Sequence, residues 1–225
     1  MHKKELFKII ITKILRALFG YVLYGLGISM TVSANLGLSP WGVLHDGIAN
    51  IFNIEFGTAT QLIGAAIVIA DIFFGERIGW GTVGNVYFIG SFINFFDRLG
   101  FIAQFENIWL SYLLLFAGML TISFATYFYL SAQLGAGPRD GLMIALTKRS
   151  KLTVGTIRNA IEICVVIVGF LLGGKTGLGT LIMAILLGQF IQFVFRLFKF
   201  DVRVIKHRYI DEDIKFFIGK FKKEL

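Results

Sequence analysis

The sequence predicts an all-α membrane protein. Six transmembrane helices form two inverted repeats of three, and each repeat contains a short helix that begins at a proline. The first supporting observation is composition, since 56% of the 225 residues are hydrophobic, 16% are charged and mean hydropathy is +0.76. A soluble domain of this size needs more polar surface, so an integral membrane protein is expected. The other two observations are an internal repeat and the placement of positive charge.

The internal repeat appears without gaps when residues 20–96 are placed on residues 118–194. Twenty of the 77 aligned pairs are identical, and seven of these are glycine pairs. Pro40 also pairs with Pro138, so the agreement is concentrated at residue types that form turns, helix starts and close helix contacts. Two unrelated apolar stretches would agree mainly at leucine, isoleucine and phenylalanine. The pattern therefore indicates a duplication with an offset of 98 residues.

The positive charges agree with opposite orientations of the two repeats. Each repeat has three predicted spans, an odd number, so the second repeat should enter the bilayer from the other side. With the N-terminus in the cytoplasm, a six-span trace leaves only Arg98 and Lys175, among all lysines and arginines, on the outer side. If the two proline-initiated segments also spanned, the repeats would be parallel and the charged segment around Arg139 would cross the bilayer at high cost. We expect a cell-membrane protein with both termini in the cytoplasm.

The chain divides into five predicted parts. They are a basic amphipathic lead-in at 1–16, the first repeat at 17–98, a linker at 99–107, the second repeat at 108–197 and a basic amphipathic tail at 198–225. Basic residues are mixed with apolar ones in the lead-in and the tail, which favours binding to anionic lipid at the cytoplasmic face. In the tail, Asp211 is a candidate cap for such a helix.

Six apolar segments are predicted to cross the bilayer, at about 1.5 Å of helix per residue. They are residues 17–38, 57–74, 82–96, 109–133, 155–172 and 180–197. After the first span of each repeat comes a segment too short to cross, Pro40–Phe52 in one and Pro138–Thr147 in the other. Ser39 before Pro40 is a helix-start signal. Both short segments are therefore predicted to be re-entrant or interfacial helices.

Three motifs carry a family resemblance over about residues 17–197. They are Gly37-x-x-Pro40-Trp41, the stretch Gly135-x-Gly137-Pro138-Arg139-Asp140-Gly141-Leu142-Met143, and Gly177-x-Gly179-Thr180. Together they resemble the YczE/YitT-type bacterial membrane proteins, and the YczE branch most closely. The resemblance implies a membrane protein and no particular activity. It also implies an acidic residue after the Pro-Trp pair, where this chain has Gly42, so Asp140 lacks an acidic counterpart in the first repeat.

The most specific candidate site is the start of the second short helix, where Arg139 and Asp140 follow Gly137 and Pro138. Free backbone N–H groups and the positive end of the helix dipole favour an anion at such a place, and an arginine adds a two-pronged donor. The functional interpretation is one half of a polar binding pocket. In the structural alternative, both side chains anchor the loop and Asp140 binds first-turn N–H groups.

Two further sets of polar residues are candidates for solute contact. Arg158 and Glu162 lie four residues apart on one face of the fifth span, so they can pair. An ionisable group at this depth is a functional candidate by default, and the alternative is an ion pair that locks the helices. On the first short helix, His45 and Asp46 either titrate in a gate or face outside water, and Trp41 is either part of the site or an interfacial anchor.

Asn94 and Gln192 occupy equivalent positions on the third and sixth spans. They either line a central path or form hydrogen bonds between helices, which is common for such residues in bilayers.

The sequence carries no enzyme signature, so no catalytic residue, cofactor or metal site is expected. Its one cysteine excludes an intrachain disulfide, and its three histidines are widely separated. The net charge of +8 lies mainly near the chain ends and around residues 139–158, which indicates anionic lipid and not nucleic acid as the partner. Two hypotheses follow: a small secondary transporter or channel for a small, anionic solute, or a non-transporting scaffold or regulator that acts through its basic tail. A homodimer is compatible with either.

Overall fold

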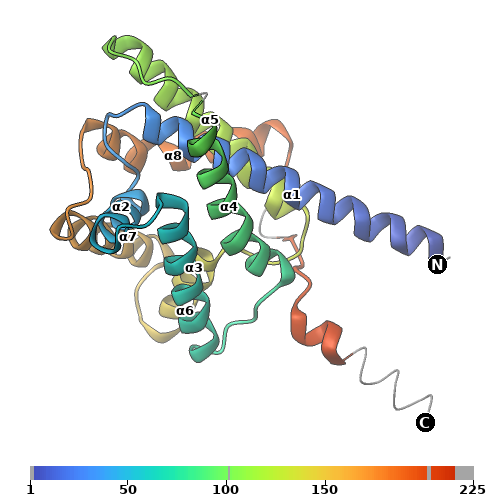
Figure 1. The fold of residues 1–225 in the computed structure, drawn as a ribbon. Helices are drawn as coiled ribbons and strands as arrows, with labels where there is room; N and C mark the ends of the chain where they lie inside the picture. The colour runs from blue at the N-terminus through green and yellow to red at the C-terminus, as the bar shows by residue number, and fades with distance from the viewer. Residues whose placement is uncertain (1–2, 101, 202–203, 216–225) are drawn as a thin grey trace.

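The computed structural model describes residues 3–100, 102–201 and 204–215, and its regular structure is helical throughout. The all-α class is therefore confirmed. Figure 1 shows the arrangement of the principal helices. They are α1 (Lys3–Ser33), α2 (Pro40–Phe52), α3 (Phe56–Phe73), α4 (Trp80–Leu99), α5 (Ile108–Ser131), α6 (Pro138–Arg149), α7 (Val154–Leu171) and α8 (Leu178–Leu197).

Five of these helices are long and apolar enough to cross a membrane: α1, α3, α5, α7 and α8. The predicted span at 82–96 lies inside α4, which is 20 residues long but is not among the five. Asn85, Ser91 and Asn94 lower its apolar character. A membrane protein is supported, and within the described residues five helices, against six predicted spans, are long and apolar enough to cross.

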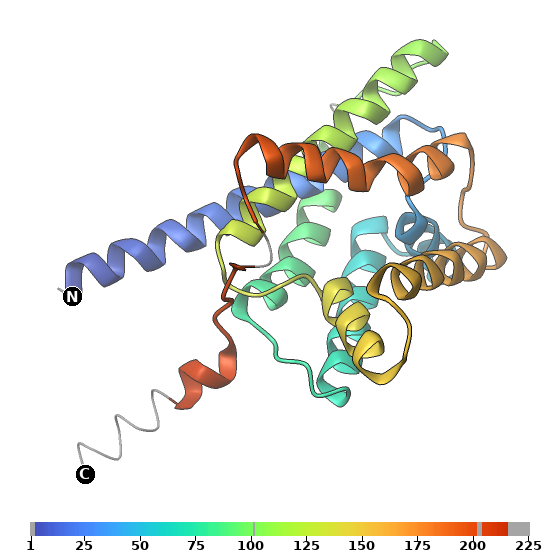
Figure 2. The ribbon, with the colours of Figure 1, turned by 180° about the vertical axis from the view of Figure 1, so that it is seen from behind.

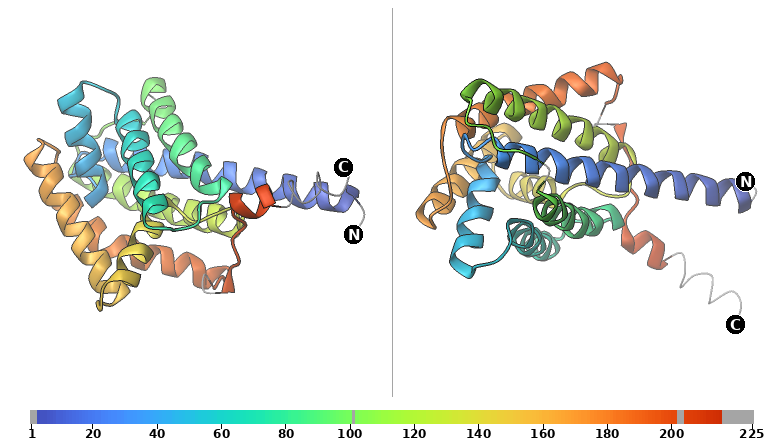
Figure 3. Two further views of the ribbon diagram at one scale, coloured as in Figure 1. Left: turned by 90° about the horizontal axis from the view of Figure 1, so that it is seen from below. Right: turned by 45° about the horizontal axis from the view of Figure 1, so that its top comes forward.

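Helix α1 runs without interruption from Lys3 to Ser33, and its apolar portion begins at Phe7. From Lys3 on, the predicted lead-in is therefore continuous with the first span in one long helix. Neither glycine nor proline occurs between residues 3 and 19, so nothing in the backbone breaks the helix there. Figure 3 shows this end of α1 extending away from the other helices.

The centre of the fold is the contact between α1 and α5, which are equivalent helices of the two repeats. Gly27 and Gly118 lie at this contact, where each would place an added Cβ within about 3 Å of the other's carbonyl oxygen. Buried aromatic residues extend the same contact, with Tyr21 and Tyr129 in one core cluster. Helix α4 packs on α1, and its equivalent α8 packs on α5.

The two repeats hold each other through reciprocal contacts. Gly81 N donates to Leu134 O at 2.7 Å, and Gly179 N donates to Leu36 O at the same distance. Both residues of one bond are offset by 98 from those of the other. The short helices also make reciprocal contacts between the repeats, since α2 packs on α7 and α6 packs on α3. Each short helix thus lies against the middle helix of the opposite repeat, which brings the two short helices into one region.

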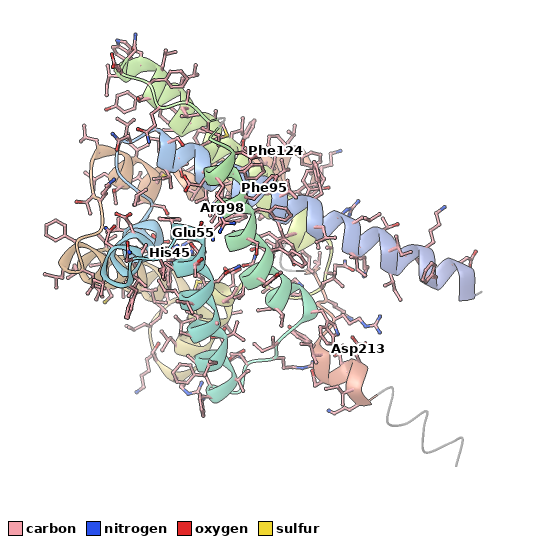
Figure 4. All side chains as sticks on the ribbon, viewed as in Figure 1. His45, Glu55, Phe95, Arg98, Phe124 and Asp213 are labelled. Atoms are coloured by element: carbon pink, nitrogen blue, oxygen red, sulfur yellow. The ribbon has the colours of Figure 1, made fainter. Side chains whose placement is uncertain are left out.

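The part of the tail at 204–215 returns to the loop between α3 and α4. Arg77 binds both carboxylate oxygens of Asp211, at 2.8 and 2.9 Å, and also Glu212. Trp80 Nε1 donates to Asp213, which Figure 4 labels beside the start of α4. Asp211 therefore acts as an ion-pair partner of the loop rather than as the predicted helix cap. The predicted basic residues at 220–223 lie outside the described residues.

Candidate functional site

The N-terminal ends of the two short helices meet inside the helix bundle. Trp41, the second residue of α2, and Arg139, the second residue of α6, occupy equivalent positions of the repeats. The guanidinium carbon of Arg139 lies 4.6 Å from the centroid of the Trp41 ring, a distance typical of a cation–π contact. The predicted start of α2 is confirmed, because the Ser39 side chain accepts a hydrogen bond from Gly42 N and Pro40 occupies the first turn. We call Trp41, His45, Arg139 and Asp140 the central cluster.

His45 is the most deeply buried member of the central cluster, at 2% exposure. Its Nδ1 lies 2.9 Å from the Thr60 hydroxyl, whose own proton goes to the carbonyl of Phe56. Nδ1 is therefore the donor, and Nε2 is left as an acceptor facing the Arg139 guanidinium at 3.4 Å. Burial, and next the charge of Arg139, hold the pKa of His45 well below its usual value, so the ring is neutral at physiological pH. Figure 4 labels His45 within the bundle.

Arg139 has no carboxylate within ion-pair distance among the described residues, although its side chain is half-buried. The neighbouring Asp140 lies beside the Tyr129 hydroxyl and the backbone of Gly137, and both favour its charged form. Burial raises the pKa of Asp140, and the positive charges of Arg158 and Arg139 oppose that effect. The nearest contacts of Arg139 are thus a neutral imidazole and an aromatic face. A half-buried guanidinium so placed retains the capacity to bind an anion.

The predicted pairing of Arg158 with Glu162 is confirmed, with Arg158 Nε 3.2 Å from Glu162 Oε1 on α7. The Arg158 side chain is 55% exposed and that of Glu162 is 25% exposed. Both charges act on the central cluster without touching it: Arg158 on Asp140, and Glu162 on Arg139. The pair therefore belongs to the electrostatic surroundings of the central cluster.

The structure places the other predicted residues away from the central cluster. Asp46 accepts a hydrogen bond from the backbone N of Lys175, in the loop before α8. Asn94 joins α4 to α3, since it accepts from Gly57 N at 2.8 Å and donates to Thr58 at 3.0 Å. This is the interhelical role that the sequence left open for Asn94. Its equivalent Gln192 is exposed, beside a surface hollow of about 350 Å³ at the end of α8.

Three residues near the central cluster were not selected from the sequence: Thr60, Asp71 and Tyr129. Asp71 lies in α3, is 1% exposed and has no hydrogen-bond partner for either carboxylate oxygen within the described chain. The rule that selected Glu162, that an ionisable residue inside a span is a functional candidate, applies equally to Asp71. Thr60 and Tyr129 carry no comparable signal, because hydroxyl side chains are ordinary in membrane helices.

Comparison with known proteins gives the family. The model of a family of unknown function, DUF6198, matches residues 11–196. The chain belongs to this family. An uncharacterized protein of Haemophilus influenzae is 36% identical over 78% of this chain and 80% of its own length. The uncharacterized membrane protein YczE of Bacillus subtilis is 33% identical over 77% of this chain and 81% of its own. These matches confirm the resemblance to the YczE branch.

A third relative, the uncharacterized protein YyaS of Bacillus subtilis, is 25% identical over 76% of this chain and 86% of its own length. No solved structure matches the chain. The chain is thus a member of a membrane-protein family of unknown function, and its activity has to be argued from the site itself.

Proposed function

We propose that this protein is a small secondary transporter or channel for a small anionic solute, which binds at the central cluster. The observation that carries the proposal is the position of Arg139, a half-buried guanidinium that pairs with no carboxylate of the described residues, at the place where the N-termini of α2 and α6 meet. Helix N-termini present free N–H groups and positive dipole ends. Two of them with an arginine between form a site whose charge an anion would neutralise.

The arrangement of the repeats supports transport over a static role. Reciprocal contacts join equivalent residues, as expected of inverted repeats around a shared site, and the two short helices serve as the broken helices that line such sites in transporters. The central cluster also combines groups from both repeats. Its solute would therefore lie between two halves that can move relative to each other.

The chemistry of the central cluster defines the solute class. The guanidinium favours a planar or tetrahedral oxyanion, such as a carboxylate, sulfate or phosphate, which can accept two parallel hydrogen bonds. His45 offers only an acceptor toward Arg139, so it orients the guanidinium and does not bind the anion. The Trp41 ring covers one face of the guanidinium, leaving the edge for the solute.

A thermal-stability screen of the detergent-purified protein against chloride, sulfate, phosphate, acetate and succinate tests this proposal. An anion at 100 times its Kd should stabilise the bound form by about 2.7 kcal/mol. Arg139→Gln should abolish that stabilisation. Lys151→Gln removes the same charge from an exposed position after α6 and should retain it. Equal stabilisation of all three proteins would place the anion elsewhere and contradict the proposal.

The alternative, a scaffold or regulator that acts through its tail, rests on the contact of Arg77 with Asp211 and Glu212. That contact orders residues 204–215 against the loop between α3 and α4. If the tail carries the function, Arg77→Gln should disable the protein in cells while Arg139→Gln should not. The proposal of transport predicts the opposite pattern.

A further inference from the structure

Asp71 is a buried carboxyl that the central cluster does not use. It lies near the C-terminal end of α3, and both of its oxygens are buried and without a hydrogen-bond partner in the described residues. A Cβ added at Gly141 would overlap Asp71 Oδ2, so the carboxyl rests directly on the first turn of α6. Gly141 directly follows Asp140 in the chain, so the Asp71 carboxyl lies at the same end of α6 as Arg139.

The charges around Asp71 do not neutralise it. The acidic groups that act on it are Glu76, which follows α3, and Asp140 on α6. Of the basic residues on α6, Lys148 binds Glu76 at 2.8 Å and Arg149 donates to the carbonyl of Phe74. Arg139 is engaged with Trp41 and His45.

The other helices that pack on α3 supply no cation either. On α2, His45 is neutral and Asp46 accepts from Lys175 N. On α4, Asp97 lies beside Arg98, which pairs with Glu55 at the start of α3, the end opposite Asp71. Figure 4 labels Glu55 and Arg98 next to each other. An ionised carboxylate buried without a cation or a hydrogen bond costs several kcal/mol, whereas a protonated carboxyl avoids that cost.

The internal repeat shows that packing does not require a carboxyl at this place. The equivalent of Asp71 in the second repeat is Gly169, which lies against the backbone of Val43 and Leu44 on α2. In the corresponding contact, between α3 and α6, the glycine is on the other helix, as Gly141, the equivalent of Val43. Because one residue of each pair is glycine, both pairs of helices pack closely. The pair of α3 and α6 has in addition the Asp71 carboxyl, which rests on the start of α6, the helix that carries Arg139.

We propose that Asp71 is a proton-binding site coupled to the anion site, so that the solute moves together with a proton. This inference rests on the proposed function. The bond formed and broken is the O–H bond of the Asp71 carboxyl: the proton is taken from water on the side where the anion enters and returned to water on the side where it leaves. The anion favours the protonated carboxyl because two negative charges at one site repel each other.

The pH dependence of anion binding tests the coupling. The probe is whichever of chloride, sulfate and acetate stabilises the wild type most, since their charges do not change near neutral pH. Above the pH at which Asp71 ionises, the affinity of the wild type should fall by up to about tenfold per pH unit, as linkage to one proton requires. Asp71→Asn, nearly identical in shape, should bind the anion with an affinity independent of pH. Asp97→Asn, a matched change at an exposed position on α4, should behave as the wild type.

A pH dependence that persists unchanged in Asp71→Asn would overturn the inference and leave the anion site standing. If no anion binds the wild type, the proposed function fails, and infrared spectroscopy then tests the proton on Asp71 alone. The wild type should show the C=O stretching band of a protonated carboxyl at neutral pH. That band should be missing in Asp71→Asn and present in Asp97→Asn. A wild type without the band would overturn the inference even if Asp71→Asn fails to fold.

Discussion

The two repeats differ most where their second and third long helices face each other. In the first repeat, α3 packs closely on α4, and we call this contact the first seam. Gly57 and Gly90 meet there so closely that a Cβ on either would overlap the carbonyl oxygen of the other. Asn94 binds Gly57 N and Thr58, and Gln61 binds Ser91 at 2.9 Å.

In the second repeat, α7 and α8 barely touch, and Figure 2 shows them apart on either side of the loop that joins them. We call their facing surfaces the second seam. Gly155 and Gly188 have open space where the equivalent glycines of the first seam meet. A groove of about 400 Å³, lined mainly by apolar residues of α7 with the connecting loop and the start of α8, occupies part of the region. The polar residues are retained at equivalent positions and are exposed: Thr156, Asn159, Gln189 and Gln192.

The comparison shows that equivalent residues of the two repeats take two different arrangements. The connection between the helices has the same length in both repeats, so the chain does not prevent α7 from packing on α8. Asn159, Gln189 and Gln192 make no hydrogen bond within the described residues, which is costly for amides on the outside of a membrane protein. A transporter that exchanges the roles of its repeats would close the second seam and open the first. The difference between the seams therefore agrees with the proposed function.

The largest expected effect comes from filling the glycine contact. Gly90→Leu should destabilise the protein by about 1–3 kcal/mol, because the added side chain has no space between α3 and α4. Gly188→Leu should change the stability by less than about 0.5 kcal/mol, because nothing lies within 4 Å of it. Unfolding in detergent followed by circular dichroism measures both. Equal destabilisation at the two sites would show that the second seam is closed as well.

Gly188→Leu then becomes a probe of function in a folded protein. If the second seam must close during transport, this variant should be inactive in an uptake assay while remaining stable. Full activity of Gly188→Leu would show that the second seam does not need to close, so that the two seams differ only in their static structure.

The second effect is the pH dependence of stability, which should differ between the short helices because His45 on α2 has Met143 as its equivalent on α6. The lowered pKa of His45 means that the unfolded state binds a proton more readily than the folded state. The contribution of His45 to the free energy of unfolding is therefore complete above about pH 6.5. Below that pH it decreases by up to about 1.4 kcal/mol per pH unit, until the pKa of His45 in the folded state is reached. His45→Gln should reduce this slope and Met143→Leu should not. The free energy of unfolding, measured across the acid range, tests this prediction. An unchanged slope of that free energy against pH in His45→Gln would show that His45 is not buried as a neutral ring.

The third effect concerns the amides of the seams. Asn94→Ala removes two hydrogen bonds between helices and should cost about 1 kcal/mol. Gln192→Ala should be close to neutral in the same unfolding measurement. A greater loss at Gln192 would mean that its amide already has a partner in the working protein.

The smallest expected effect is cross-linking of the second seam, because the arrangement in which α7 packs on α8 should be populated by a minor fraction of the molecules. In a Cys164→Ser background, the double variant Thr58→Cys with Asn94→Cys should form a disulfide readily, because the native side chains are 3.0 Å apart. The equivalent pair, Thr156→Cys with Gln192→Cys, should cross-link only in a minor fraction, which should change when an anion is added. Equal, anion-independent yields from both pairs would contradict two interchangeable arrangements.

Much of the fold follows from the sequence because backbone-specific residues mark it. The repeated glycines and prolines predict the reversals, and the start and end of the first short helix match α2 at Pro40–Phe52. The continuity of α1 was missed because a basic amphipathic segment has the same composition on a lipid surface and at the end of a long helix. The third predicted span, inside α4, is less apolar than the five others because several of its polar residues pair with α3, which periodicity alone does not show.

The site was less predictable than the fold. Arg139 was selected because a charge after Gly-Pro in an apolar stretch is unusual. Its contact with His45, 94 residues away, depends on how the two repeats interlock, so the sequence placed these residues at separate sites. Asp71 was not predicted as a site residue, although its position inside a predicted span was itself a signal.

The central claim is that Arg139 binds an anion between the two repeats, and uptake by proteoliposomes tests it most directly. Vesicles containing the wild type should accumulate the radiolabelled form of the anion that stabilises the protein. Vesicles with Lys151→Gln should do the same, and those with Arg139→Gln should not exceed empty vesicles. Uptake by Arg139→Gln at the wild-type rate would contradict the account.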